Sequence, residues 1–277
     1  MPACLLEDRG IARVAGEEAR SFLQGILTCN LDRIEPGRPG FGALLTPQGK
    51  ILFDFILSAR DEGDYWLDCP RMLAPDLARR LSIYRLRAKV TIEDISVHMG
   101  VGAIWDESQT GADLLGAETD PRNCELGFRV LGSRDSLLDN PIFERDTSVY
   151  EARRIALGVP KGGADFAYGD AFPHEANMDR LHGLDFQKGC YVGQEVVSRV
   201  EHRGLARKRV VRVRFDSAAP PPGMPVMAGG TEIGQTGSVA GNRGLAMLRL
   251  DRVEDARAAG VAIVTQEGVG LVVEPTP

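Results

Sequence analysis

The stretch KGCYVGQEVVSR at residues 188–199 is the most unusual part of this 277-residue sequence, and the rest of the chain is interpreted outward from it. Gly189 and Gly193 flank Cys190 and permit a tight backbone path around it. The residues that follow place an acid early and a base late, which favours a helix. Cys190 would then lie just before a helix N-terminus with Lys188 nearby, and both features stabilise a thiolate. We therefore predict a reactive thiol at Cys190, the alternative being a buried cysteine that acts as a small hydrophobe.

The other metal-ligating residue types show no spacing that indicates a metal site. The remaining cysteines are far apart and never form a C-x-x-C pair: Cys4, Cys29, Cys69 and Cys124. This argues against both a disulfide framework and a structural zinc site. We interpret the histidines His174, His182 and His202 as surface or packing residues.

The composition of the chain argues against nucleic acids and membranes as partners. The net charge of −6 gives no basic stripe of the kind that neutralises phosphates, so nucleic acid is an unlikely partner class. Acidic residues follow Met1 closely, and no uncharged apolar stretch reaches spanning length, so we predict no membrane partner. A cytoplasmic location is the resulting expectation.

Hydrophobic periodicity predicts a mixed set of elements before the cysteine stretch. The expected helices cover residues 19–26, 72–84 and 150–157, and the expected strands cover residues 51–57, 64–69, 86–92, 97–104 and 126–131. Because the order lacks strict βαβ alternation, an α+β domain is favoured over a doubly wound sheet.

The end of the chain has a different pattern. After the interruption PPPG at residues 220–223, short strand candidates alternate with Gly-rich turns, which predicts a small antiparallel β-barrel. We place a domain boundary near residue 205, with a body at 1–204 and a barrel at 205–277. The basic run between residues 203 and 214 is interpreted as the solvated face of a strand rather than an RNA contact.

Several segments together resemble one known family. They are FLQG at 22–25, LTPQGKI at 45–51, YRLRAKV at 84–90, PHEAN at 173–177 and KGCYVGQE at 188–195. The last is similar to the K-G-C-[FY]-x-G-Q-E signature of the YgfZ/GcvT-like folate-binding family, which is related to the T protein of the glycine cleavage system. The resemblance implies an α+β body with a central channel for tetrahydrofolate or a one-carbon derivative, and a C-terminal barrel beside it.

The resemblance also implies site residues. Glu175 matches the acid of a P-x-E motif that faces the pterin, and a carboxylate suits an aminopyrimidine edge. The alternative for Glu175 is a solvated or helix-capping side chain. Within the signature, Cys190 and Lys188 are the predicted reactive residues. Tyr191, Gln194 and Glu195 are predicted to contact the cofactor.

Three further cofactor contacts are predicted at positions where the chain differs from catalytic relatives or carries an unusual charge. The relatives have adjacent aspartates where this chain has Phe53 and Asp54, which weakens the case for aminomethyl transfer. Asp54 would be costly to bury alone, so it should meet a ligand, Arg87 or Lys89. Arg87 is alternatively suited to the anionic tail of a folate. Asn30 replaces an acid, and either loosens folate contacts or preserves a hydrogen bond.

The resulting hypothesis is a tetrahydrofolate-binding protein that assists iron–sulfur cluster assembly or repair through Cys190. One cysteine cannot supply the four ligands of a cluster. Any cluster would therefore be transient and shared with a scaffold protein, a client protein or a small thiol. The alternatives are a folate-dependent aminomethyl or one-carbon transferase, and a folate-binding accessory factor in tRNA modification. A non-enzymatic role is favoured over a transferase.

Overall fold

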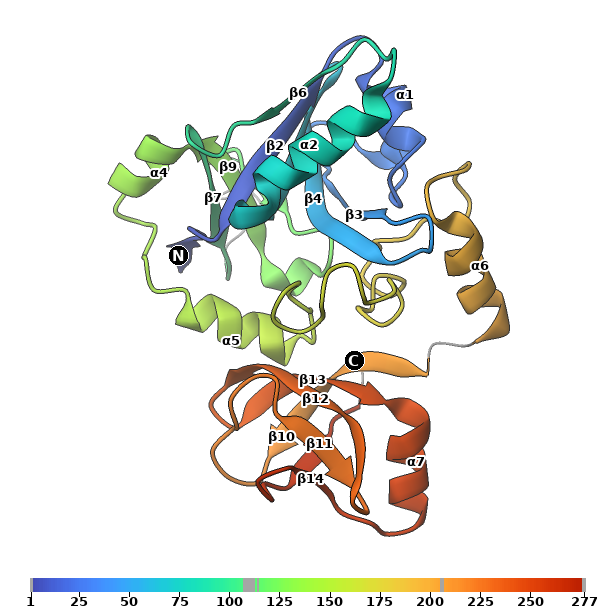
Figure 1. The fold of residues 1–277 in the computed structure, drawn as a ribbon. Helices are drawn as coiled ribbons and strands as arrows, with labels where there is room; N and C mark the ends of the chain where they lie inside the picture. Colours follow the sequence, from blue (N-terminus) through green and yellow to red (C-terminus); the bar gives the residue numbers. More distant parts are fainter. Residues whose placement is uncertain (1, 107–112, 114, 205–206, 276–277) are drawn as a thin grey trace.

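The computed structural model describes residues 2–106, 113, 115–204 and 207–275, and shows a body of two β-sheets next to a separate barrel (Figure 1). The chain starts in the body and ends in the barrel, as the sequence predicts. In the described part of the chain, no helix is both long enough and apolar enough to cross a membrane.

The larger sheet of the body has five antiparallel strands in the order β3-β4-β5-β2-β6. Their bounds are β2 Arg9–Ala15, β3 Gly40–Leu45, β4 Ile51–Asp61, β5 Asp64–Pro70 and β6 Thr91–Asp94. Two helices, α1 (Ala19–Gln24) and α2 (Ala74–Arg85), share one apolar core with this sheet. Strand β4 is buried over most of its length, which explains why its sequence is nearly all apolar.

The smaller sheet has four strands in the order β1-β7-β9-β8. Their bounds are β1 Ala3–Leu5, β7 Met99–Ile104, β8 Glu118–Thr119 and β9 Phe128–Ser133, and the short helix α4 (Arg134–Asp139) packs on β7 and β9. Strand β7 also approaches β2, so the two sheets are close together at these two inner strands.

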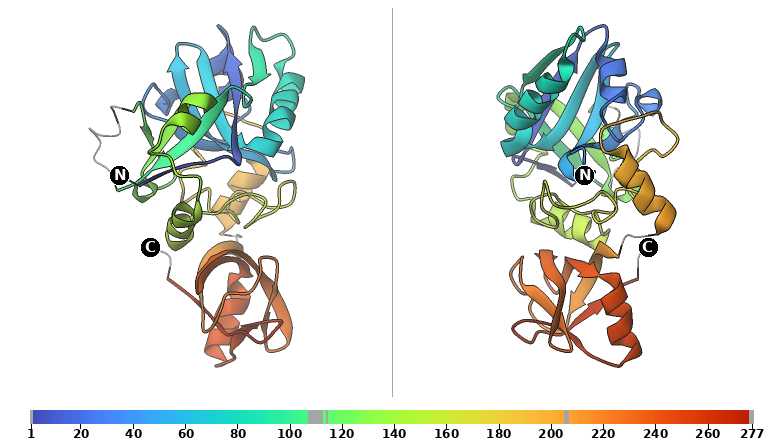
Figure 2. Two further views of the ribbon diagram at one scale, coloured as in Figure 1. Left: turned by 90° about the vertical axis from the view of Figure 1, so that its left-hand side faces the viewer. Right: turned by 45° about the vertical axis from the view of Figure 1, so that its right-hand side comes forward.

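Two helices flank the junction between body and barrel (Figures 1 and 2). Helix α5 (Ser148–Ala156) packs on the barrel strands β12 and β13, and ends before Gly158, as predicted. Helix α6 (Gln194–Arg203) lies on the other side of the junction in Figure 1. Between them, the chain from 157 to 193 has no long element and is held by turns.

The barrel is a six-stranded antiparallel sheet in the order β14-β11-β12-β13-β10-β15. Its elements are β10 Lys208–Phe215, β11 Pro225–Ala228, β12 Thr231–Ala240, β13 Arg243–Arg249, α7 Leu250–Ala258, β14 Ile263–Thr265 and β15 Leu271–Val273. The first and last strands of this order approach each other, so the sheet nearly closes. The predicted barrel is confirmed, whereas α7 was not predicted. The predicted boundary adjoins residues 205–206, which lie outside the described residues, and stays a prediction.

One predicted strand is wrong. Residues 86–90 form a turn rather than the first part of a strand over 86–92, and β6 starts only at Thr91. Leu86 adopts a left-handed backbone with φ of 48°, which ends α2 and reverses the chain. The alternating pattern that suggested a strand arises because Arg87 and Lys89 both project into solvent.

Candidate functional site

Cys190 lies in the loop before α6, and its side chain is exposed. Cys124 is the other exposed cysteine of the five. The remaining three are buried, and burial raises the thiol pKa of Cys4 to about 12, of Cys29 to about 11 and of Cys69 to about 12. Such thiols are poor nucleophiles and poor ligands. The alternative of a buried Cys190 is therefore wrong, while its reactivity stays a prediction.

Lys188 holds the cysteine loop from inside the protein. Its ammonium donates hydrogen bonds of 2.6 Å to the backbone carbonyls of Leu27 and Cys29, and lies 5.4 Å from the centre of the Tyr191 ring. Burial lowers the pKa of this lysine. The prediction placed this charge beside the Cys190 thiolate. The described contacts instead make Lys188 a tether for the loop, because its donors are directed at buried carbonyls.

A glycine contact fixes the start of α6. Gly193, the residue that precedes the helix, has φ of 83°, and a side chain there would place Cβ 2.6 Å from the Thr46 carbonyl oxygen. It packs against Gly49, whose own φ is 80°. This explains why the segments around 45–51 and 188–195 both carry the family resemblance: they pack against each other. Gly189 has no close neighbour, so only one glycine of the bracket is required.

The other three signature residues lie away from the central cavity. Tyr191 is buried in a core that joins the body to the barrel, and burial raises its pKa to about 12. Gln194 opens α6, and Glu195 is an exposed acid in the first turn of that helix. None of the three lines the central cavity between the two sheets. Their predicted contact with a cofactor is not supported by this placement.

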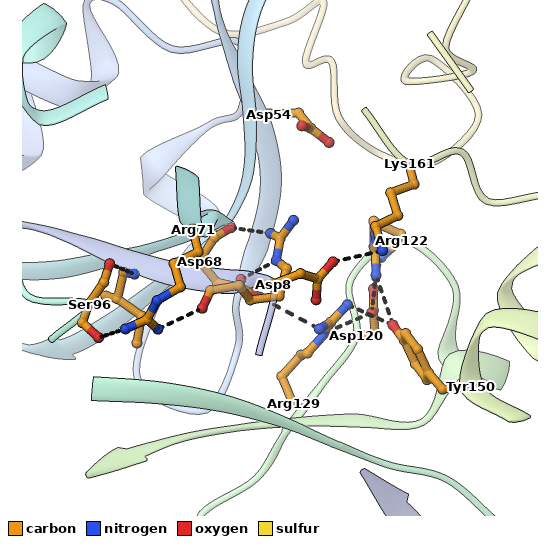
Figure 3. Close-up of polar contacts among 12 residues, drawn as sticks. Asp8, Asp54, Asp68, Arg71, Ser96, Asp120, Arg122, Arg129, Tyr150 and Lys161 are labelled. Carbon is orange, nitrogen blue, oxygen red and sulfur yellow. Dashed lines mark hydrogen bonds and ion pairs between the residues drawn. The ribbon is translucent and has the colours of Figure 1, made fainter. Parts of the chain in front are cut away.

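The centre of the body is occupied by buried charged side chains (Figure 3). The Asp120 carboxylate accepts hydrogen bonds of 2.9 and 2.7 Å from Arg122 and one of 3.2 Å from Arg129. Arg129 also donates to the Tyr150 hydroxyl at 2.7 Å. Burial alone would raise the pKa of Asp120, but the two guanidinium groups outweigh it and lower the pKa to about 2. Asp120, Arg122, Arg129 and Tyr150 are called the central cluster below.

A second pair extends the central cluster toward the larger sheet. Arg9 on β2 donates a 2.6 Å hydrogen bond to the Asp68 carboxylate on β5. The other Asp68 oxygen lies 3.8 Å from Arg129 Nη1, and neither atom has a hydrogen-bond partner among the described residues. Buried polar atoms normally have a partner, so this gap is suited to a water or a small polar group.

Asp54 lies at the edge of this cavity, but its partner differs from the prediction. Its buried carboxylate accepts a short hydrogen bond from the Tyr168 hydroxyl. Burial, together with the Asp54 charge, strongly raises the pKa of Tyr168, so the tyrosine stays a proton donor. Neither predicted partner is close: Arg87 is exposed beyond α2, and Lys89 pairs with Glu17 at 3.2 Å. Nothing in the sequence around Tyr168 marked it in advance.

Glu175 and Asn30 perform local structural roles. The Glu175 carboxylate accepts a 2.8 Å hydrogen bond from the Phe172 backbone N–H, and so closes a turn rather than capping a helix. The Asn30 side-chain oxygen accepts 3.0 Å hydrogen bonds from the Gln24 amide and the Asp32 backbone N–H. It therefore stabilises the turn after α1. Arg87, another predicted folate contact outside the signature, is exposed on the outer surface.

A group of possible metal ligands lies beside α6. One ligand atom from each of His174, Asp179 and Glu201 lies within 4.8 Å of the others. Both Asp179 oxygens, however, accept hydrogen bonds from Arg209, at 2.8 and 2.7 Å. Because a guanidinium already neutralises the carboxylate, we assign no metal to this group. The pairing also buries Arg209, so this member of the basic run does not lie on a solvated face as predicted.

The central cavity is small compared with the binding sites of organic ligands. Its volume is about 20 Å³, which is room for about one water. Pockets for small organic ligands have volumes of about 300–1,000 Å³. Three members of the central cluster, Arg122, Arg129 and Tyr150, line this cavity. A pterin ring would enter this cavity only if its lining side chains moved.

Comparison with known proteins supports the fold. The model of the CAF17 C-terminal beta-barrel domain matches residues 207–275. Over the whole chain, the fold is similar to the crystal structure of glycine cleavage system aminomethyltransferase T from Bartonella henselae, with a TM-score of 0.78 and 15% identity. That match covers 100% of this chain and 85% of the other. The predicted α+β fold with a C-terminal barrel is confirmed.

Curated relatives share the sequence over most of its length. The human mitochondrial iron–sulfur cluster assembly factor IBA57 is 32% identical, and the match covers 91% of this chain and 79% of the human protein. The mitochondrial homologue from Coccidioides immitis is 30% identical, with 92% and 73% covered. The homologue from Mycosarcoma maydis is 31% identical, and this chain spans 57% of its length.

These relatives contradict the predicted cytoplasmic location, because each of them is named as a mitochondrial protein. The prediction depended on the lack of a signal-peptide pattern and of an apolar span. The lack of those two features does not identify a compartment.

Proposed function

This chain belongs to the IBA57 family of iron–sulfur cluster assembly factors, and from this premise we propose that it presents the Cys190 thiolate as one ligand of a cluster shared with a second protein. The observation that carries the proposal is the exposed thiol on a loop that is fixed at both sides. The cluster is cargo here, and not a resident cofactor of the chain.

The count of available thiols supports a shared cluster. Iron–sulfur clusters usually take four protein ligands. Of the five cysteines, only Cys190 and Cys124 are exposed. Cys190 precedes α6, whereas Cys124 is next to Asn123 in a turn of the body before β9. One accessible thiol at the proposed site leaves the other ligands to a scaffold or client protein.

The residues around Cys190 are suited to holding the thiol in one place. Lys188 fixes the loop on its inner side, and Gly193 lets α6 begin against the turn at Gly49. The Asp185 carboxylate accepts hydrogen bonds from the backbone N–H groups of Gln187 and Lys188, at 2.8 and 2.9 Å. A fixed thiol loses little conformational freedom when a ligand bond forms.

Two cysteine variants test the proposal in cells. In a strain without its own copy of the gene, the wild-type chain and Cys124→Ser should restore aconitase activity, while Cys190→Ser should not. Immunoblots must show equal amounts of the three proteins. Restoration by Cys190→Ser would refute the ligand role, and loss with Cys124→Ser alone would assign the role to the other exposed thiol.

Tetrahydrofolate binding stays a prediction of the family resemblance, and the central cavity gives it no support. Calorimetric titration with tetrahydrofolate tests this prediction, and the absence of saturable binding would refute it. Saturable binding that is lost in Asp54→Asn would show instead that the cavity opens. We propose neither transferase activity nor a role in tRNA modification.

A further inference from the structure

The loop that carries Cys190 also exposes an aromatic side chain. Phe186 is 42% exposed, and among the described residues it is the one aromatic side chain in the class of exposed large hydrophobics. Single exposed aliphatic side chains are common on protein surfaces. Aromatic side chains, in contrast, are enriched where proteins bind one another. The exposed ring of Phe186 therefore needs an explanation that the fold alone does not give.

The Phe186 ring is held in place from beneath. Its centre lies 6.2 Å from the centre of the His174 imidazole, and the two planes are tilted by 35°. His174 is buried, and its Nε2 lies 3.0 Å from the Glu201 carboxylate on α6. The backbone N–H of the next residue, Gln187, is fixed by the Asp185 carboxylate. A ring that is already held loses little conformational freedom when a partner covers it, which favours binding.

The size of a protein interface places Phe186 close to any partner that reaches Cys190. A specific interface covers about 800 Å² of each protein, which is roughly a disc of about 16 Å radius. Four residues of fully extended chain span at most about 14 Å. Phe186 is four residues from Cys190, so the two lie within one interface radius of each other.

The side chains that border the ring are polar. The Arg33 guanidinium is 62% exposed and lies 3.4 Å from the Asp185 carboxylate and 3.5 Å from the Gln187 side-chain oxygen. Glu201 is 45% exposed and already contacts His174. These charges are of opposite sign and have partners within the chain, so charge does not select what binds here. An apolar centre inside a polar rim is the usual arrangement of a protein interface.

We propose that Phe186 is the apolar anchor that docks the protein supplying the other ligands of the cluster. Because this docking surface rests on the proposed role of Cys190 as a cluster ligand, the partner must present cysteine thiolates beside an apolar pocket that accepts the ring. The exposed part of the ring is about 80 Å² of a side chain of about 200 Å². Its burial corresponds to about a thirtyfold change in Kd.

Docking is measured apart from cluster binding. A purified iron–sulfur scaffold protein, either free of cluster or loaded with a [2Fe–2S] cluster, is titrated anaerobically into wild type, Phe186→Ser and Ile83→Ser in a calorimeter. Phe186→Ser should raise Kd about thirtyfold for both forms of the scaffold. Ile83 is 61% exposed on α2, and its variant is the matched control that should leave Kd unchanged. An unchanged Kd in Phe186→Ser overturns the proposal.

A footprint tests the same surface with Phe186 intact. In a chain that carries Cys124→Ser and Cys190→Ser, Gln187→Cys provides the one exposed cysteine, since the other three are buried. The cluster-free scaffold should slow its alkylation by N-ethylmaleimide in a saturable way. Full-rate alkylation at a saturating scaffold concentration overturns the proposal. So does a dimer of wild type that dissociates in Phe186→Ser, because it would assign the surface to a second copy of the chain.

Cys190→Ser separates this inference from the proposed function. This variant should bind the cluster-free scaffold with the wild-type Kd, because Phe186 is intact. If Cys190→Ser loses iron while Phe186→Ser docks normally, the ligand role stands and the docking surface is refuted. If Phe186→Ser loses docking while Cys190→Ser keeps iron, the docking surface stands and the ligand role is refuted.

Discussion

Replacing Lys188 by methionine distinguishes two roles for this lysine: holding the cysteine loop in place, or activating the Cys190 thiol. The change removes the ammonium that donates two 2.6 Å hydrogen bonds to the carbonyls of Leu27 and Cys29, and keeps much of the side-chain volume. Losing a donor at a buried carbonyl costs about 1–3 kcal/mol. The variant loses two such donors, but it also no longer buries a charge, which offsets part of the cost. We therefore expect the free energy of unfolding to fall by about 2–4 kcal/mol.

The assay is urea unfolding of Lys188→Met against wild type, with Lys89→Met as the matched control. Lys89 has an exposed side chain and pairs only with exposed Glu17, so its variant should stay within about 0.5 kcal/mol of wild type. A change in Lys188→Met as small as that of the control would refute the tether. Slower alkylation of Cys190 in Lys188→Met, without loss of stability, would support the activator role instead.

The pH dependence of the free energy of unfolding is a second, independent test of the role of Lys188. Burial lowers the pKa of Lys188 below 10.5, so the folded chain releases this proton before the unfolded chain does. Between the two pKa values the unfolded state binds more protons, and stability therefore rises with pH through that window. Lys188→Met should lack this rise, whereas Lys89→Met should keep it.

Two further predictions concern the central cluster and the start of α6. Asp120→Asn should destabilise the fold by about 3–5 kcal/mol in thermal or urea unfolding, because Arg122 and Arg129 lose their shared carboxylate. The Asp120 pKa is lowered from 3.8 to about 2, so wild type should lose about 2 kcal/mol as the pH falls through this window, and the variant should not. Gly193→Ala should cost about 2–4 kcal/mol, because its φ is 83° and its Cβ would lie 2.6 Å from the Thr46 oxygen. Gly189→Ala should be nearly neutral by the same assay, and equal effects of the two glycine variants would contradict this reasoning.

The elements of the fold were largely predictable because their signals are local. Strand β4, its partner β5 and helix α5 follow from runs of strand formers, helical spacing and the stop at Gly158. The turn at residues 86–90 was not predicted, because it depends on a left-handed backbone at Leu86. Leucine rarely adopts this conformation, so the sequence gives no signal for it.

The site was predictable only for features that depend on a single residue and its neighbours in sequence. Exposure of Cys190 followed from its unusual neighbours, but the direction of the Lys188 side chain did not, since spacing in sequence says nothing about which carbonyls lie beneath it. Asp54 was correctly expected to need a partner, yet Tyr168 lies 114 residues away. The filling of the central cavity depends on residues from separate strands that meet only in the folded chain.

The proposed role of Cys190 as a cluster ligand is tested most directly by a cluster-sharing experiment with purified proteins. A scaffold protein loaded with a [2Fe–2S] cluster is mixed anaerobically with wild type, Cys190→Ser or Cys124→Ser, and the visible absorption and iron content of the complex are measured after gel filtration. Iron should co-elute with wild type and with Cys124→Ser, and should be lost from Cys190→Ser. Iron that co-elutes equally with Cys190→Ser would contradict this role.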